Sequence, residues 1–251
     1  MVPLIDRFKK EHIKQSFIDR MLTTKIISII ITVKYRKYIK KAKKYVAISD
    51  DQANILINRY SIHPDFISYD PIDKCFFKYS DNHQRDSLLV FNDLQNSPKF
   101  SEIIDICKNI GITRVVCIGG KKCDDSLQGI KIQYVKSYTF EEISGIYFSA
   151  CLAITSEAKG SFELIPIESL VSGVPVITPE VPSINVLKHH FPYEENTPFF
   201  DYFEFMEGNI EKFISWYNNV NTSRYCFSRK LSEFFNVENV AIKFLSSLKS
   251  N

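Results

Sequence analysis

The sequence predicts an α/β protein built on a single Rossmann-like, doubly wound parallel sheet, with basic helices before the sheet and further helices after it. Two observations carry this prediction. From Tyr45 onward, short runs of apolar and β-branched residues alternate with amphipathic stretches of helical period. The runs are mostly apolar rather than apolar at every second residue, which is typical of parallel strands covered on both faces. Because crossovers between parallel strands are right-handed, such an order folds into one doubly wound sheet.

The predicted strands follow one another along the chain with amphipathic stretches between most of them. The first is VAIS at 46–49, which DDQANILINRY follows. The later strands are FISYD, SLLVFN, RVVCIGG, IKIQYV, CLAITS and VPVITP, at 66–70, 87–92, 114–120, 130–135, 151–156 and 174–179. Gly111 and Gly173 stand where glycine commonly ends a helix, so each is predicted to close the helix before it.

Beyond residue 200 the chain is predicted to form helices only. The helical segments are GNIEKFISWYNNV, SRKLSEFF and VENVAIKFLSSLK. We therefore divide the sequence into a basic helical segment, residues 1–45, and a Rossmann-like domain with its C-terminal helices, residues 46–251.

Composition excludes several classes of protein. The 251 residues are 45% hydrophobic and 24% charged, as in ordinary soluble globular proteins. The six cysteines show no CxxC pair and no metal-ligand spacing, so we expect reduced thiols and no metal site. The N-terminus lacks the apolar core of a signal peptide. The longest apolar run, Ile26–Val33, is shorter than the ~20 residues of a membrane span. A cytoplasmic protein is expected, either free or peripheral at a membrane.

Charge is distributed unevenly. Residues 1–45 carry 13 Lys and Arg against 3 Asp and Glu, a net +10, so the remaining residues sum to −7. This excess suggests an anionic partner for residues 25–44, with a membrane surface favoured over nucleic acid. Nucleic acid is disfavoured because the rest of the chain is acidic. The alternative is a solvated basic helix that packs its apolar stripe on the main domain.

The predicted topology also indicates where a ligand binds. In open α/β sheets, ligands lie at the carboxyl ends of strands, often against helix N-termini. The most informative of the strand-end loops follows the strand that ends at Ser156 and leads into a helix near Leu164 or Ile165. Amides at that helix start can hold a phosphate, and Glu168, about one turn on, can accept from two ribose hydroxyls. The alternative is a plain strand–helix connection with Glu168 in solvent.

The segment SFELIPIESLVSGVPVIT resembles the donor-site signature of retaining GT-B glycosyltransferases of family 4, EGFGLxxxEAMAxGxPVI. Four further segments are similar to that family in order, namely YVAISDDQANILINRYSIHPDFISYDPID, LLVFNDLQNSPKF, RVVCIGG and IYFSACLAITS. The resemblance covers roughly residues 40–245. It implies that residues 46–190 form a nucleotide-sugar-binding domain, the C-terminal half of a GT-B fold with most of the acceptor half missing.

The resemblance also implies roles for individual residues. Glu168 corresponds to the glutamate that holds the nucleotide ribose, and Lys99 to the lysine that contacts the diphosphate; both are our catalytic candidates. The loop of Ser161, Phe162, Glu163 and Leu164 corresponds to the backbone that approaches the phosphates. Gly119 lets the chain turn near the donor, and the strand-end loop containing Ser137 corresponds to the segment that holds the base.

The implied function is that of a retaining hexosyltransferase whose substrate is a nucleotide sugar such as a UDP- or GDP-sugar, with no further cofactor. The acceptor site would come from a partner protein, a second copy of the chain or a membrane surface. The sequence departs from the family signature at Gly160 and Glu163, where the signature has a glutamate and a glycine, and from the family's upstream segment at Asp93, where the family has an arginine. These departures favour an alternative function as a catalytically inactive, glycosyltransferase-like scaffold or subunit.

Overall fold

A computed structural model describes residues 44–77, 85–91, 99–119, 126–156, 162–191 and 197–249, together with residues 42, 94 and 97. The predicted basic helices before residue 42, and most of the segment proposed to meet an anionic surface, lie outside the described residues. Within the described ranges, none of the helices is long and apolar enough to cross a bilayer.

A seven-stranded sheet forms the centre of the molecule, with the strand order β5-β6-β4-β3-β7-β8-β9. All neighbouring strands pair in parallel except β5 and β6, which pair antiparallel. The six parallel strands, taken in chain order, have the Rossmann arrangement 3-2-1-4-5-6. The predicted Rossmann-like sheet is therefore confirmed. The strands are β3 (Ser87–Phe91), β4 (Arg114–Ile118), β5 (Ser126–Leu127), β6 (Ile130–Val135), β7 (Ala150–Ile154), β8 (Val176–Thr178) and β9 (Phe199–Asp201).

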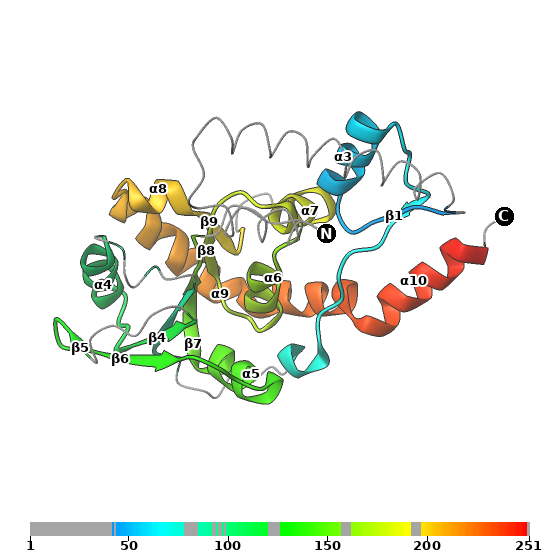
Figure 1. The fold of residues 1–251 in the computed structure, drawn as a ribbon. Coiled ribbons are helices and arrows are strands. Elements are labelled where there is room, and N and C mark those ends of the chain that lie inside the picture. Colours follow the sequence, from blue (N-terminus) through cyan, green and yellow to red (C-terminus); the bar gives the residue numbers. More distant parts are fainter. Residues whose placement is uncertain are drawn as a thin grey trace, which may run out of the picture.

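Helices cover both faces of this sheet (Figure 1). One face packs against α4 (Phe100–Asn109), α8 (Tyr202–Met206) and the first half of α9 (Ile210–Phe235). The opposite face packs against η1 (Lys74–Phe77), α5 (Phe140–Ser149), α6 (Leu164–Val171) and α7 (Pro182–His190). Helix α9 serves both faces, since its early residues join one core and its last residues join the other.

Strand β3 shows why the runs are apolar throughout. Its five residues are all buried. Leu88 and Val90 join the core beneath α4, whereas Leu89 and Phe91 join the core beneath α5 and α6. Successive side chains of a strand point to opposite faces, so a strand buried on both sides needs apolar residues at every position.

Coverage of both faces fails at β6. Ile130 and Ile132 are buried on the α4 side, but Lys131 and Gln133, which point the other way, are exposed. The sequence already alternates in IKIQYV, and this alternation is the mark of a strand with one solvated face. The expectation of a sheet covered on both faces therefore holds at the centre and not at this strand.

A second, two-stranded parallel sheet pairs β1 (Val46–Ala47) with β2 (Phe66–Ile67), joined by α3 (Asp50–Tyr60). This unit contacts the last helix, α10 (Val237–Lys249), which lies on the same side of the molecule in Figure 1. The Lys44 ammonium donates to the carbonyl oxygens of Ser247 and Leu248, at 3.0 and 3.4 Å. The start of the described chain is thus held against its end.

The glycines predicted to end helices are confirmed, whereas most strands are shorter than predicted and two further boundaries differ. Gly111 and Gly173 follow α4 and α6 with φ of +79° and +71°, as expected of glycines that end helices. The segments GNIEKFISWYNNV and SRKLSEFF, predicted as separate helices, form the single helix α9. Strand β9 lies at 199–201, at the start of the region that was predicted to contain helices only.

Candidate functional site

The Rossmann order places a topological switch point between β3 and β7, because the chain leaves these two adjacent strands toward opposite sides. Ligands of open α/β sheets bind in the crevice at that point, outside the carboxyl ends of the strands. In this chain β3 is followed by Lys99 and α4, and β7 is followed by α6.

Helix α6 begins at Leu164, as predicted, immediately after Glu163 as its N-cap residue. Glu163 has extended backbone angles, φ −81° and ψ 121°, and its side chain makes no capping hydrogen bond to the helix. The Glu163 side chain therefore does not cap the first amides of α6. Ser161, predicted to be part of this loop, lies outside the described residues.

Phe162 anchors the loop before α6 in the core. Its side chain is only 8% exposed and stacks on the Tyr69 ring, with 6.1 Å between centroids. It also contacts the Phe235 ring at the end of α9. An aromatic side chain held this way fixes the backbone at the helix start. Any role of Phe162 toward a ligand would therefore be through its backbone.

Glu168 lies in the fifth position of α6, half-buried, with its carboxylate turned toward α5. The fully buried Tyr147 hydroxyl donates to its Oε2 at 3.2 Å. The Tyr147 ring in turn stacks on Phe91, the last residue of β3, at 6.0 Å. Glu168 is thus connected through one side chain to the carboxyl end of the switch-point strand.

Burial raises the pKa of Glu168 above its ordinary value, and the Tyr147 hydrogen bond offsets part of this effect. Burial, followed by the nearby Glu168 charge, raises the pKa of Tyr147 well above 10.0. Within the described part of the chain, Glu168 forms no ion pair. Hydroxyl groups of a ligand could donate hydrogen bonds to such a half-buried carboxylate and so stabilise its negative charge.

The remaining predicted residues lie at other points of the same carboxyl edge. Lys99 precedes α4, and its exposed ammonium donates to the Met206 carbonyl at the end of α8, at 2.8 Å. Gly119 follows β4 with φ +74°, and its N–H donates to the Val135 carbonyl at 3.0 Å, which joins the ends of β4 and β6. Ser137 follows β6 and is exposed.

A groove of about 490 Å³ extends from Ser137 along the uncovered face of β6. The strand residues of its floor include Val116, Gln133 and Val135, and α5 supplies its wall. Gly145 lies in that wall, and a Cβ there would meet nothing within 4 Å. Tyr138, 48% exposed, stands at the end of the groove nearest the carboxyl edge. The segment predicted to hold a base is therefore the mouth of an open groove with a planar aromatic ring beside it.

No protein-family model and no curated protein matches the sequence. Solved structures are similar. The pneumococcal O-GlcNAc transferase GtfA in complex with UDP and GlcNAc has a TM-score of 0.56 at 17% identity, over 85% of this chain and 46% of that one. The GtfA/B complex gives 0.59 at 14%, over 85% and 46%. Anabaena HepE in complex with UDP-glucose gives 0.57 at 13%, over 84% and 64%.

The chain has the fold of one half of a GT-B glycosyltransferase. This confirms the fold that the resemblance implied. The chain spans about half the length of GtfA and less than two thirds of HepE. Identities of 13–17% show the fold alone, so donor, acceptor and activity are matters for proposal.

Two features of this GT-B half were not predicted from the sequence. Tyr147, 21 positions before Glu168, becomes its hydrogen-bond donor because α5 and α6 pack on the same face of the sheet. The Tyr69 hydroxyl donates to Asp50 at 3.2 Å and lies 2.8 Å from Nε2 of His190. Tyrosines placed among apolar residues, as in GIYFSAC and FISYD, were the available signal, since a buried hydroxyl needs a partner.

Proposed function

We propose that this chain is the donor-binding half of a glycosyltransferase that uses a nucleotide-diphosphate sugar. The observation that carries the proposal is Glu168, a half-buried carboxylate without a cation among the described residues, on the helix that starts at the switch point of the sheet. The similarity to solved glycosyltransferases, two of them in complex with UDP or UDP-glucose, supports it. Retention of configuration and a hexose donor follow from the resemblance of residues 161–178 to the family 4 signature.

In this proposal the α6 amides hold the diphosphate, because an N-terminal helix end presents free N–H groups and a partial positive charge. Glu168 accepts hydrogen bonds from the ribose hydroxyls, and these hydrogen bonds stabilise its ionised form. The base lies near Ser137, at the mouth of the groove beside α5. Gly119 holds the turn between these two sites.

Catalysis would be electrostatic. The leaving group is a nucleoside diphosphate, so positive charge and N–H donors at its phosphates stabilise the transition state. Lys99 is the proposed cation. Its ammonium is exposed at the carboxyl edge and bonded to one carbonyl, so it must exchange the Met206 carbonyl for the diphosphate when the donor binds.

A second component for the acceptor site is part of this proposal. GtfA, one of the similar structures, occurs in a complex with GtfB. We propose a partner protein or a second copy of this chain as the source of the acceptor site. Peripheral attachment to an anionic membrane through residues 25–44 remains part of the proposal, tested by sedimentation of the chain with and without residues 1–44 on anionic vesicles.

A second function, a non-catalytic scaffold of the same fold, is favoured by one observation. The Glu163 carboxylate oxygens are buried at the N-cap of α6, where a phosphate would lie. A negative charge at that point opposes a second one unless the carboxylate is protonated or turned away. A scaffold of this kind would keep the sheet and lose affinity for nucleotides.

A thermal-shift screen against UDP, GDP, ADP and their common sugars separates the two functions. A nucleotide at about 100 times its Kd adds about 2.7 kcal/mol, which raises Tm by roughly 5–10 °C in a chain of this size. The donor-site proposal predicts such a shift for one nucleotide, and its loss in Glu168→Ala. The absence of a shift at millimolar concentration of every nucleotide would favour the scaffold.

A further inference from the structure

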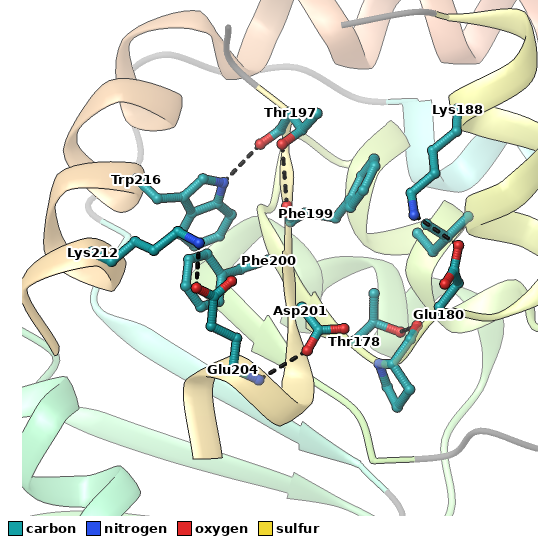
Figure 2. Close-up of a pocket in the computed structure, with 12 residues that line it drawn as sticks. Thr178, Glu180, Lys188, Thr197, Phe199, Phe200, Asp201, Glu204, Lys212 and Trp216 are labelled. Atoms are coloured by element: carbon teal, nitrogen blue, oxygen red, sulfur yellow. Dashed lines mark hydrogen bonds and ion pairs between the residues drawn. The ribbon is translucent and has the colours of Figure 1, made fainter. Parts of the chain in front are cut away.

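A second cavity, of about 290 Å³, lies at the carboxyl ends of β8 and β9, at the edge of the sheet (Figure 2). It is formed by segments from both faces, namely the β8–α7 loop and α7 on one side and α8 and α9 on the other. Its charged and aromatic lining residues are Glu180, Lys188, Phe199, Phe200, Asp201, Glu204, Lys212 and Trp216. None of these residues takes part in the proposed donor site.

Two ion pairs face each other across β9 in this cavity (Figure 2). Lys188 Nζ lies 2.9 Å from Glu180 Oε1 on the α7 side, and Lys212 pairs with Glu204 on the α9 side. An ammonium carries three donors and a carboxylate about four acceptor positions, so each pair keeps donors and acceptors for a ligand. The two walls therefore offer both kinds of hydrogen-bonding group.

Asp201 lies between the two pairs, at the end of β9. Its Oδ1 accepts from the Glu204 N–H at 2.8 Å as the N-cap of α8. Among the described residues no cation pairs with it. The cavity thus has a formal charge of −1, which disfavours phosphates and other anions.

Aromatic side chains form the apolar part of the cavity. The Trp216 Nε1–H donates to the Thr197 carbonyl at 2.7 Å, and its ring packs on Phe200 with 5.2 Å between centroids. Phe199 extends into the cavity on the other side of β9 (Figure 2). Aromatic rings fixed in this way present rigid faces to the C–H groups of a ligand.

Addition of a peptide strand to β9 is not favoured by this geometry. Strand addition needs free carbonyl oxygens along the open edge. The Thr197 carbonyl already accepts from Trp216, and the Phe199 carbonyl accepts from the Thr197 hydroxyl at 3.4 Å. A small ligand that uses side chains rather than the strand edge fits the site better.

We infer that this cavity binds a neutral sugar ring. The hydroxyl groups of a sugar both donate and accept hydrogen bonds, as the Lys–Glu pairs of the two walls do. The C–H face of the sugar ring can pack on Phe199 and Trp216. The volume lies near the lower end of the range for ligand pockets, about 300–1,000 Å³. This site goes beyond the proposed donor site. It lies at the same edge of the sheet, about 10 Å away at two strand spacings.

Trp216 is the single tryptophan of the 251 residues, so its fluorescence reports on this cavity alone. We would excite the full chain selectively at tryptophan and titrate glucose, N-acetylglucosamine, maltotriose, cellotriose and tri-N-acetylchitotriose to tens of millimolar. Glycerol at matched osmolality is the solvent control, and spermidine is the cationic control. A saturable change in emission with at least one sugar is expected.

Matched variants locate the binding. Glu204→Gln and Glu180→Gln each remove one carboxylate of a wall, and each is expected to weaken sugar binding on the order of tenfold. Glu233→Gln is the control, because it removes a carboxylate from an exposed pair with Arg229 on the same helix, α9, about 25 Å along it from Trp216. Sugar affinity should be unchanged in Glu233→Gln.

The results separate this inference from the donor proposal. Sugar binding should survive Glu168→Ala, whereas nucleotide binding should not. The inference is overturned if no sugar changes the emission, if spermidine alone does so, or if Glu204→Gln and Glu233→Gln respond equally. Each of these outcomes leaves the nucleotide screen free to succeed or fail independently.

Discussion

The switch point near Glu168 and the β8–β9 cavity lie at the same edge of one sheet and differ in how their glutamates are paired. Glu168 is half-buried and receives a hydrogen bond from Tyr147. Glu180 and Glu204, in the cavity, each pair with a lysine at the surface. A half-buried carboxylate without a cation makes the folded state less stable, whereas a carboxylate in a surface ion pair changes stability little.

This difference indicates different ligands. Sites that hold an electrostatically unfavourable group in the free protein recover that energy when a specific ligand supplies the missing partner. We therefore expect tight, specific binding beside Glu168 and weak binding of a neutral ligand between the balanced pairs.

Substitution of Arg85 and of Lys212 compares how much a cation at the centre of the sheet and one at its edge stabilise the fold. The Arg85 Nη1 donates to the carbonyls of Ala150, Ser172 and Gly173 at 3.2–3.4 Å, and so holds β7 and the end of α6 beside β3. Arg85→Met should cost about 3 kcal/mol, a fall in Tm of roughly 6–12 °C. Lys212→Met should cost less than about 1 kcal/mol. Equal losses in calorimetry would remove the distinction between centre and edge.

The pH dependence of stability tests the state of Glu168. Burial raises the pKa of Glu168 in the folded chain, so its contribution to stability is complete below the ordinary value of 4.5 and is lost as pH rises through the raised pKa. Glu168→Gln should therefore raise Tm at pH 7.5, and the gain should shrink as pH falls toward 4.5. The exposed Glu233→Gln serves as control, with a difference from wild type that changes little over the same range.

Substitution of Gly145 has the smallest expected effect and tests whether the nucleotide base enters the groove beside α5. Glycine inside α5 costs roughly 0.5–1 kcal/mol relative to alanine, and a Cβ at this position meets nothing within 4 Å. Gly145→Ala should therefore raise Tm by roughly 1–4 °C. If the base reaches into the groove beside α5, the same change should weaken nucleotide binding. An increase in Tm with unchanged affinity would confine the base to the mouth at Ser137.

The centre of the fold was predictable from the sequence because burial on both faces demands continuous apolar runs. The runs at β3, β4, β7 and β8 have no other simple explanation. The break predicted within α9 was wrong for a local reason. Asn and Thr are weak helix formers, but α9 continues through NNVNTS because its apolar stripe is buried on both sides, at Phe213 and Tyr217 before it and at Leu231 after it.

The candidate sites were predictable only in part. The α6 start and Glu168 lie within one continuous segment whose strand–loop–helix order is visible in the sequence. The β8–β9 cavity is assembled from residues 178–188 and 197–216, and β9 is only three residues long. Pairs such as Lys212–Glu204 depend on how α8 turns into α9, which no local pattern specifies. Packing, rather than sequence period, creates that cavity.

The central claim is that Glu168 is kept for a ligand at the expense of stability. Calorimetric titration of UDP or GDP, whichever raises Tm in the screen, into wild-type chain and Glu168→Gln at pH 7.5 tests it most directly. Glu168→Gln should melt at a higher temperature than wild type and bind the nucleotide at least about tenfold more weakly. Equal nucleotide affinity in the two proteins would contradict it.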